Sequence, residues 1–123
     1  MATLPVVDDE QDIRDLVVQR MVRDGHEVLS ADSGPSALDL VRECGLPVAA
    51  ILDVDMPGMD GFDVLRELRV LRSDLPVMLL TVLWGSKLQS RVRAAEVACL
   101  GKPFTAAQLA DGVQALLSPD RDP

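Results

Sequence analysis

The feature that most constrains the fold is a pair of short, continuously apolar segments, Val48–Leu52 and Pro76–Leu80. A strand with one solvated face alternates apolar and polar residues, whereas a strand without alternation is typical of a parallel sheet covered on both faces. Asp53 directly follows the first segment and Thr81 follows the second. The sequence therefore predicts two buried central strands with a polar side chain at the end of each.

Strand-like and helix-like segments alternate about five times along the chain. The expected strands are Leu4–Val7, His26–Ala31, Val48–Leu52, Pro76–Leu80 and Ala98–Leu100. The segments between them repeat apolar residues at helical spacing, the first of them at Ile13, Leu16, Val17 and Met21. Such alternation predicts right-handed βαβ units and an α/β fold, a doubly wound parallel sheet with helices on both faces.

The length of 123 residues is that of one domain, which we expect to span residues 1–117, with residues 118–123 as a tail or the start of a linker. The net charge of -8 argues against direct binding of nucleic acid by this segment, because phosphate contacts need clustered Lys and Arg. The chain has no apolar stretch that could span a membrane and no basic segment before Glu10, so we expect no signal peptide and a cytoplasmic location. Cys44 and Cys99 lack metal-ligand spacing and are expected to be free thiols.

Polar side chains follow four of the five expected strands. Asp8 and Asp9 follow the first strand, Asp53 the third, Thr81 the fourth and Lys102 the fifth. Ligands of such sheets bind at the carboxyl ends of the strands, where these side chains meet. Each of them alone has an ordinary explanation, such as a helix cap or a solvated turn, but their shared position at one edge indicates a site.

The residue types at this edge fit phosphoryl transfer onto an aspartate. Three carboxylates repel one another, and a hard divalent cation such as Mg²⁺ relieves that repulsion. A carboxylate can act as a nucleophile and become an acyl phosphate. Lys102 and Thr81 could then supply a charge and a hydrogen bond to the transferring oxygens.

The motifs that carry this chemistry resemble those of the receiver domain of two-component response regulators, of the chemotaxis-regulator type. They are Asp8-Asp9-Glu10, Leu52-Asp53-Val54, Met56-Pro57-Gly58-Met59-Asp60-Gly61, Thr81 and Lys102-Pro103-Phe104. The resemblance extends from about Leu4 to Leu117. It implies a flavodoxin-like receiver fold with five parallel strands in the order 2-1-3-4-5.

The resemblance also implies a role for each site residue. Asp53 would be the phosphoacceptor, modified once per molecule by a phosphohistidine of a sensor kinase or a phosphotransfer protein, without enzymatic turnover. Thr81 would be the switch hydroxyl, and Lys102, joined to Pro103 by a cis peptide bond, would pair with the acceptor and then with the phosphoryl group. The implied ligands of Mg²⁺ (or Mn²⁺) are Asp9, Asp53, the backbone carbonyl of Asp55 and, through water, Asp8. The effector domain or protein that receives the signal is not encoded in these motifs.

Several positions depart from the family pattern. Val82 follows Thr81 where the family prefers Ala or Gly, and Cys99 stands where the family usually has an aromatic residue. The segment before the fifth strand is shortened, and the loop from Val82 to Lys87 is lengthened. We therefore expect the signal to affect mainly the loop after Thr81, which carries Leu83 and Trp84.

Two other functions are compatible with parts of the pattern. The departures could indicate a degenerate receiver that acts as a constitutive protein-interaction module. Asp53-Val54-Asp55 also resembles the nucleophile motif of haloacid dehalogenase-type phosphatases. Those enzymes need a later acidic metal motif, and none of the acidic residues after Asp74 is expected at a strand end.

Overall fold

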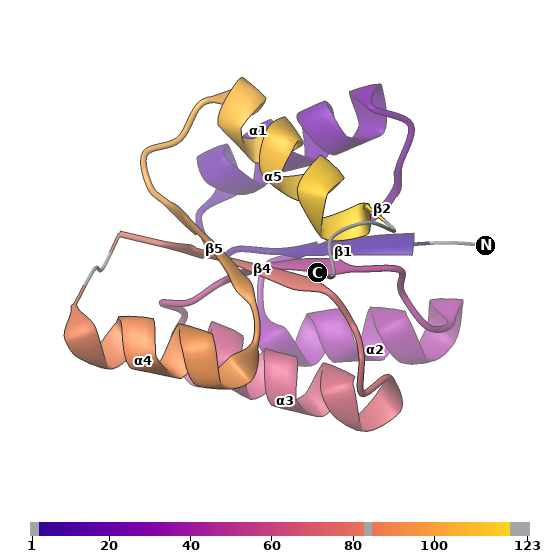
Figure 1. Cartoon of the computed structure of the whole chain (residues 1–123). Coiled ribbons are helices and arrows are strands. Elements are labelled where there is room, and N and C mark those ends of the chain that lie inside the picture. Colours follow the sequence, from indigo (N-terminus) through magenta and orange to yellow (C-terminus); the bar gives the residue numbers. More distant parts are fainter. Residues whose placement is uncertain (1–2, 83–84, 119–123) are drawn as a thin grey trace.

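The structure is a computed structural model that describes residues 3–82 and 85–118. One parallel five-stranded sheet in the order β2-β1-β3-β4-β5 is surrounded by five helices (Figure 1). The strands are β1 (Thr3–Val7), β2 (Glu27–Ala31), β3 (Ala50–Asp53), β4 (Val77–Thr81) and β5 (Ala98–Gly101). The helices are α1 (Gln11–Arg23), α2 (Gly34–Cys44), α3 (Gly61–Leu71), α4 (Ser86–Ala95) and α5 (Ala106–Leu117). The predicted fold class and strand order are confirmed.

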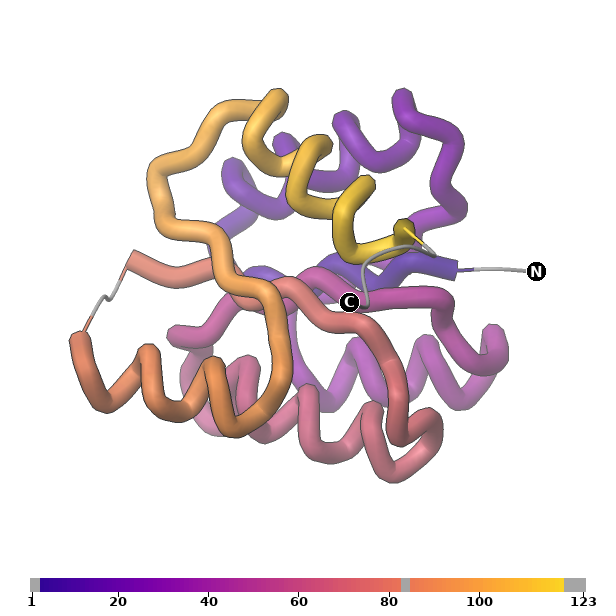
Figure 2. Tube along the Cα trace, in the orientation of Figure 1, coloured from indigo at the N-terminus to yellow at the C-terminus, as the bar shows by residue number. Residues whose placement is uncertain are grey.

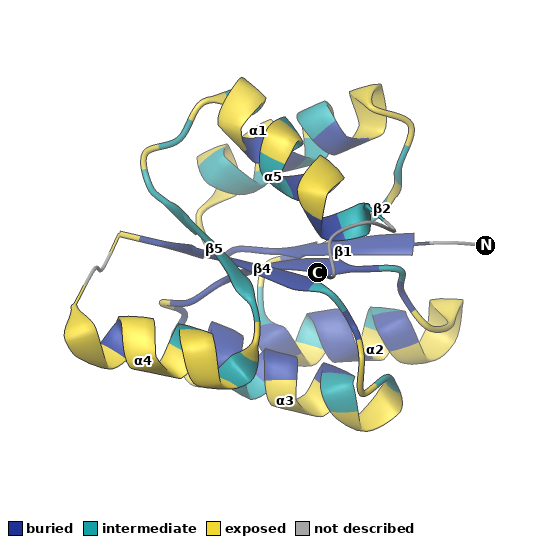
Figure 3. Ribbon diagram, in the orientation of Figure 1, coloured by how far each residue is buried: buried dark blue, intermediate teal, exposed yellow. Residues whose placement is uncertain are grey.

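The sheet separates two layers of helices, each with its own apolar core. Helices α1 and α5 cover one face, and α2, α3 and α4 cover the other (Figures 1 and 2). Neighbouring residues of β3 enter different cores: Ile51 packs on the α1 and α5 side and Leu52 on the other side. β1, β3 and β4 are buried along their whole length, which Figure 3 shows for β1 and β4. The apolar runs of the sequence do not alternate because both faces of these strands are covered.

The structure shifts some of the expected boundaries. β3 begins at Ala50, not Val48, and the ladder continues beyond its last residue through the hydrogen bond from Val54 N–H to Leu80 O at 2.9 Å. The second strand begins one residue later than expected, because His26 N–H donates to Met21 O at the end of α1.

The two terminal polar residues therefore belong to the strands themselves. β4 runs from Val77 to Thr81, and Asp53 is the last residue of β3. In the parallel register, Asp53 pairs with Leu80, so Thr81 lies one residue beyond the acceptor candidate on the neighbouring strand.

One expected core position is wrong. Val17 and Met21 of α1 are buried, whereas Leu16 is 40% exposed. The buried face of α1 is therefore narrower than the distribution of its apolar residues suggests.

In the described part of the chain, no helix is long and apolar enough to cross a membrane. α5 ends at Leu117, and residues 119–123 of the predicted tail lie outside the described residues, so that boundary stays a prediction.

Helix α4 is attached to the rest of the layer by its apolar side chains and by arginine side chains of α3 and α4. Leu88 is the one α4 residue classed as buried. The Arg69 guanidinium donates to Leu75 O at 3.0 and 3.3 Å, to Glu96 O at 3.2 Å and to Ala95 O. Arg69 thus ties the end of α4 to α3 and to the turn before β4.

We predict that Arg69→Ala lowers the free energy of unfolding by about 1.5–3 kcal/mol, because three carbonyls lose a charged donor. Arg66→Ala is the matched control on the same helix, since Arg66 forms only an exposed ion pair with Asp63, worth about 0–1 kcal/mol. Urea denaturation of the two variants measures the difference. Equal losses of stability would contradict the role assigned to Arg69.

Candidate functional site

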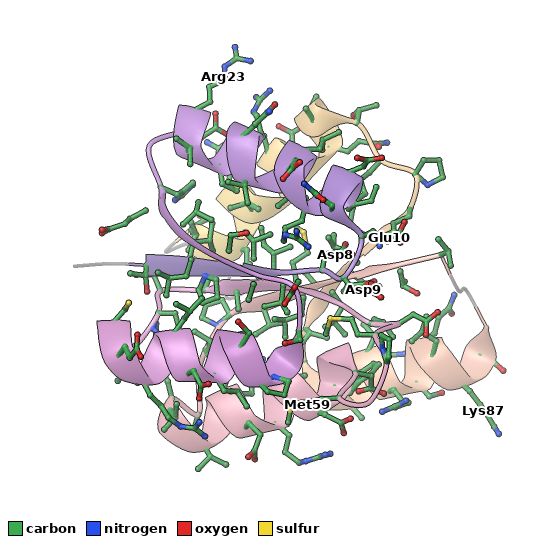
Figure 4. The ribbon with its side chains drawn as sticks, turned by 180° about the vertical axis from the view of Figure 1, so that it is seen from behind. Asp8, Asp9, Glu10, Arg23, Met59 and Lys87 are labelled. Carbon is green, nitrogen blue, oxygen red and sulfur yellow. The ribbon has the colours of Figure 1, made fainter. Side chains whose placement is uncertain are left out.

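The side chains predicted at the carboxyl edge of the sheet are brought together there. Asp8 directly follows β1, Asp53 ends β3, Thr81 ends β4 and Lys102 directly follows β5. Figure 4 shows Asp8, Asp9 and Glu10 gathered at one end of the sheet, where α1 begins. Asp8, Asp53 and Thr81 are buried, with exposed fractions of 0%, 2% and 1%. Burial of two carboxylates at one edge requires compensating charge.

The ammonium of Lys102 supplies part of that charge. Its Nζ lies 3.1 Å from Asp8 Oδ2, 3.2 Å from Asp53 Oδ1 and 3.3 Å from Glu10 Oε1. The Lys102 side chain is only 7% exposed. Its backbone N–H donates to Thr81 O at 2.8 Å, which attaches the residue to the end of β4. One cation thus bridges carboxylates from two separate strand ends.

The loop after Asp53 folds tightly against the acceptor candidate. Gly61 N–H donates to Val54 O at 3.0 Å, and a Cβ atom on Gly61 would lie 2.4 Å from Asp53 O. Only glycine permits this approach of α3 to the β3 backbone. The first turn of α3 is fixed by a capping box between Asp60 and Asp63, with bonds of 2.9 and 3.0 Å. The sequence Asp60-Gly61 therefore positions the loop that borders Asp53.

Four carboxylates form a group that could hold a metal ion. One oxygen each from Asp8, Asp9, Glu10 and Asp53 can be chosen so that all lie within 4.8 Å of one another. Asp8 Oδ1 accepts from Glu10 N–H at 2.9 Å and its other oxygen contacts Lys102, whereas Asp9 is exposed. This set consists of hard oxygen donors, which fits Mg²⁺ or Mn²⁺ better than a softer metal.

Asp55 lies beside the cluster through its backbone. Its side chain is exposed, and its backbone N–H hydrogen-bonds to the Asp53 carboxylate. The predicted use of the Asp55 carbonyl is compatible with this position. The sequence-based reasoning missed Glu10, to which it assigned no role. Its position next to the Asp8-Asp9 pair and just before α1 was the signal that could have identified it.

Burial and charge raise the pKa of Asp53 to about 7. Burial in the sheet edge is the main cause, and the nearby charge of Asp8 adds to it, while Lys102 and the Asp55 N–H oppose it. Burial alone would lower the pKa of Lys102, but its hydrogen bonds to Asp8 and Asp53 and their charges outweigh this, and that pKa is raised. The ammonium therefore stays charged while Asp53 titrates near neutrality.

These motifs and this geometry agree with the comparisons to known proteins. Residues 4–114 match the response regulator receiver domain. The chain belongs to the receiver domain family of response regulators.

The most similar relatives include full-length regulators and isolated receivers. The response regulator MprA of Mycobacterium sp. (strain KMS) is 36% identical over 124 residues, which cover 96% of this chain and 53% of that protein. The chemotaxis protein CheY4 of Vibrio cholerae superimposes with a TM-score of 0.87 at 29% identity, covering 95% of this chain and 99% of that one. The receiver domain of NtrX from Brucella abortus gives a TM-score of 0.85 at 29% identity, with the same coverages. The receiver spans about half the length of the curated relatives it matches.

Val82 directly follows Thr81, and Cys99 lies on β5 three residues before Lys102. The Lys102–Pro103 bond is cis, as predicted. Cys99 is a free, half-buried thiol of β5 opposite Leu79 of β4, and burial raises its pKa. Val82 is 59% exposed. Leu83 and Trp84, on which the signal was expected to act, lie outside the described residues.

We predict that Asp53→Asn stabilises the metal-free receiver, and more so as the pH rises. In unfolded chains Asp53 ionises near its usual pKa of 3.8, but in the folded receiver near about 7. Between these values the unfolded state loses its proton first, so increasing pH favours unfolding of the wild type. In EDTA the Tm advantage of the variant should grow from about pH 4.5 to about pH 7.5 and reach on the order of 5 °C.

Differential scanning fluorimetry with an external dye measures the Tm of both proteins. The control is Asp39→Asn, which changes an exposed carboxylate of α2. Asp39→Asn should show no such pH-dependent gain. A Tm difference for Asp53→Asn that stays constant across this range would contradict the raised pKa.

Proposed function

We propose that this receiver accepts a phosphoryl group on Asp53 and, in the modified state, controls a downstream effector. The observation that carries the proposal is the buried Asp53 carboxylate at the end of a central strand, with the Lys102 ammonium 3.2 Å away. A pKa near 7 leaves a large fraction of Asp53 ionised, and therefore nucleophilic, at neutral pH.

The residues of the site have separate roles in this reaction. A carboxylate oxygen of Asp53 attacks phosphorus, a new O–P bond forms, the N–P bond of a phosphohistidine breaks, and the leaving imidazole takes up a proton from water. Lys102 compensates the charge of Asp53 before transfer and pairs with the phosphoryl oxygens after it. Thr81, at the end of the adjacent strand, supplies the hydroxyl that hydrogen-bonds to the same group.

The carboxylates would also hold a divalent ion. Asp9, Asp53 and the Asp55 backbone carbonyl would ligate Mg²⁺ or Mn²⁺, and Asp8, occupied by Lys102 and Glu10 N–H, would act through water. When bound, the ion neutralises charge on the carboxylates and on the phosphoryl oxygens.

The phosphodonor in this proposal is a histidine kinase or a histidine phosphotransfer protein, which implies a cytoplasmic site of action. The receiver is modified once per molecule and does not turn over substrate as an enzyme. The relatives of about twice its length are named as response regulators or transcriptional regulators. An effector domain or an effector protein is therefore the expected target of the modified state.

We predict that acetyl phosphate with Mg²⁺ adds one phosphoryl group per wild-type molecule and none to Asp53→Asn. Intact-protein mass spectrometry measures the stoichiometry, and hydroxylamine should remove the label because an acyl phosphate is cleaved by it. Asp39→Asn, an exposed change on α2, should be labelled like the wild type. Continued release of phosphate from a phosphate ester, or a hydroxylamine-stable label on Ser or Thr, would argue against a receiver function.

We also predict that Asp9→Ala weakens Mg²⁺ binding about tenfold or more, because it removes an exposed carboxylate from the cluster. Isothermal titration calorimetry measures the affinity. Asp12→Ala removes a neighbouring charge in the first turn of α1 outside the cluster and is the matched control. Equal Mg²⁺ affinities for Asp9→Ala and the wild type would remove Asp9 from the ligand set.

A further inference from the structure

Helix α4 is a basic element on an acidic protein. Residues 75–95 contain Lys87, Arg91 and Arg93 and no Asp or Glu, although the chain has a net charge of -8. Within the described residues, none of the ion pairs includes any of these three side chains. No described carboxylate therefore neutralises the positive charge of α4 through an ion pair.

A groove with an apolar floor lies between α4 and α3. Its volume is about 400 Å³, and it is lined by Phe62, Leu65 and Val70 of α3 and by Ala95 of α4, with arginines at its rim. Val70 is 77% exposed, the highest value among the exposed large apolar residues. Its lining includes none of Asp8, Asp9, Glu10, Asp53, Thr81 and Lys102, the side chains gathered at the carboxyl edge.

The three arginines that line the groove differ in whether a carboxylate or a carbonyl already binds their guanidinium. Arg66 is paired with Asp63 at 2.7 Å, and Arg69 is bound to backbone carbonyls. Arg91 stacks over the Phe62 ring, with 3.9 Å from the guanidinium carbon to the ring centroid. Stacking fixes the position of the Arg91 guanidinium without neutralising its charge.

Lys87 extends this charge along α4. It lies four residues before Arg91 and so on the same side of the helix. Figure 4 shows Lys87 pointing away from the ribbon, at the far side of the molecule from Arg23. Helix α4 thus carries two cations on one side, Arg91 in the lining of the groove and Lys87 one turn before it.

We propose that the α3–α4 groove is a docking surface for an acidic amphipathic helix of a partner protein. The space between two helices accepts a helix whose apolar side chains lie on the floor. Carboxylates flanking its apolar stripe would then face Lys87 and Arg91. Nucleic acid fits less well, because an apolar floor offers no contact to its phosphates. None of the residues that line the groove belongs to the proposed phosphorylation site, so the unmodified receiver can be used for the test.

The probe for the test is a dye-labelled synthetic helical peptide with a leucine stripe flanked by glutamates. A peptide with lysines in place of the glutamates and a labelled DNA duplex are the comparison ligands. Fluorescence anisotropy with the full chain should give a Kd on the order of 10–100 μM for the acidic peptide. Arg91→Glu should weaken this binding about tenfold, since it reverses a charge in the lining of the groove, and Lys87→Glu about threefold, since it reverses a charge one turn away.

Arg23→Glu is the matched control, because it makes the same charge change at an exposed residue of α1, on the far side of the molecule. It should alter Kd by less than about twofold. Amide chemical shifts of the wild type should change on α3 and α4 on adding the acidic peptide. Lys87→Glu carries the test if Arg91→Glu fails to fold. The proposal is overturned by no binding up to about 1 mM, by equal losses in Arg23→Glu, by equal binding of the lysine peptide, or by tighter binding of DNA at the same residues.

Discussion

The arrangement at the carboxyl edge depends on one ammonium group that serves several carboxylates. Asp8 and Asp53 are buried, and leaving two unpaired buried carboxylates would cost several kcal/mol. Lys102, 94 residues from Asp8 in sequence, compensates only part of this charge. Burial raises the pKa of Asp53, and the negative charge of Asp8 adds to this effect. The uncompensated negative charge also makes the edge a place where a second cation is favourable. The buried negative charge therefore affects both the pKa of the proposed nucleophile and the binding of the proposed metal ion.

Much of this edge could be predicted because the relevant signals are local in sequence. Unalternating apolar runs located β3 and β4, and the positions of Asp53 and Thr81 followed from the ends of those runs. The predicted strand ends differ from the observed ones by one or two residues, since a ladder of backbone hydrogen bonds continues for as long as a partner strand offers carbonyls. Glu10 was missed because its contact with Lys102 depends on how α1 leaves β1, which residue spacing does not encode.

The attachment of α4 was also beyond sequence-based prediction. The charged and apolar residues of α4 predict a helix. Its attachment, however, uses hydrogen bonds from Arg69 to the backbone carbonyl of Leu75 in a turn and to that of Ala95, 26 residues from Arg69, at the end of α4. Backbone carbonyls have no sequence signature. Both helix layers have an apolar core, but α4 is also held by guanidinium groups, through the Arg69 hydrogen bonds and the stacking of Arg91 on Phe62.

The position of β5 at the border of the sheet has a consequence for local motion. β5 pairs with β4 alone, and its four residues are only half-buried. Hydrogen bonds at such borders open more readily than those of central strands. Lys102 follows β5 directly, so separation of the strand end from Thr81 would carry the ammonium away from two buried carboxylates. The resulting electrostatic penalty opposes fraying, so the acidic edge stabilises the position of a strand at the border of the sheet.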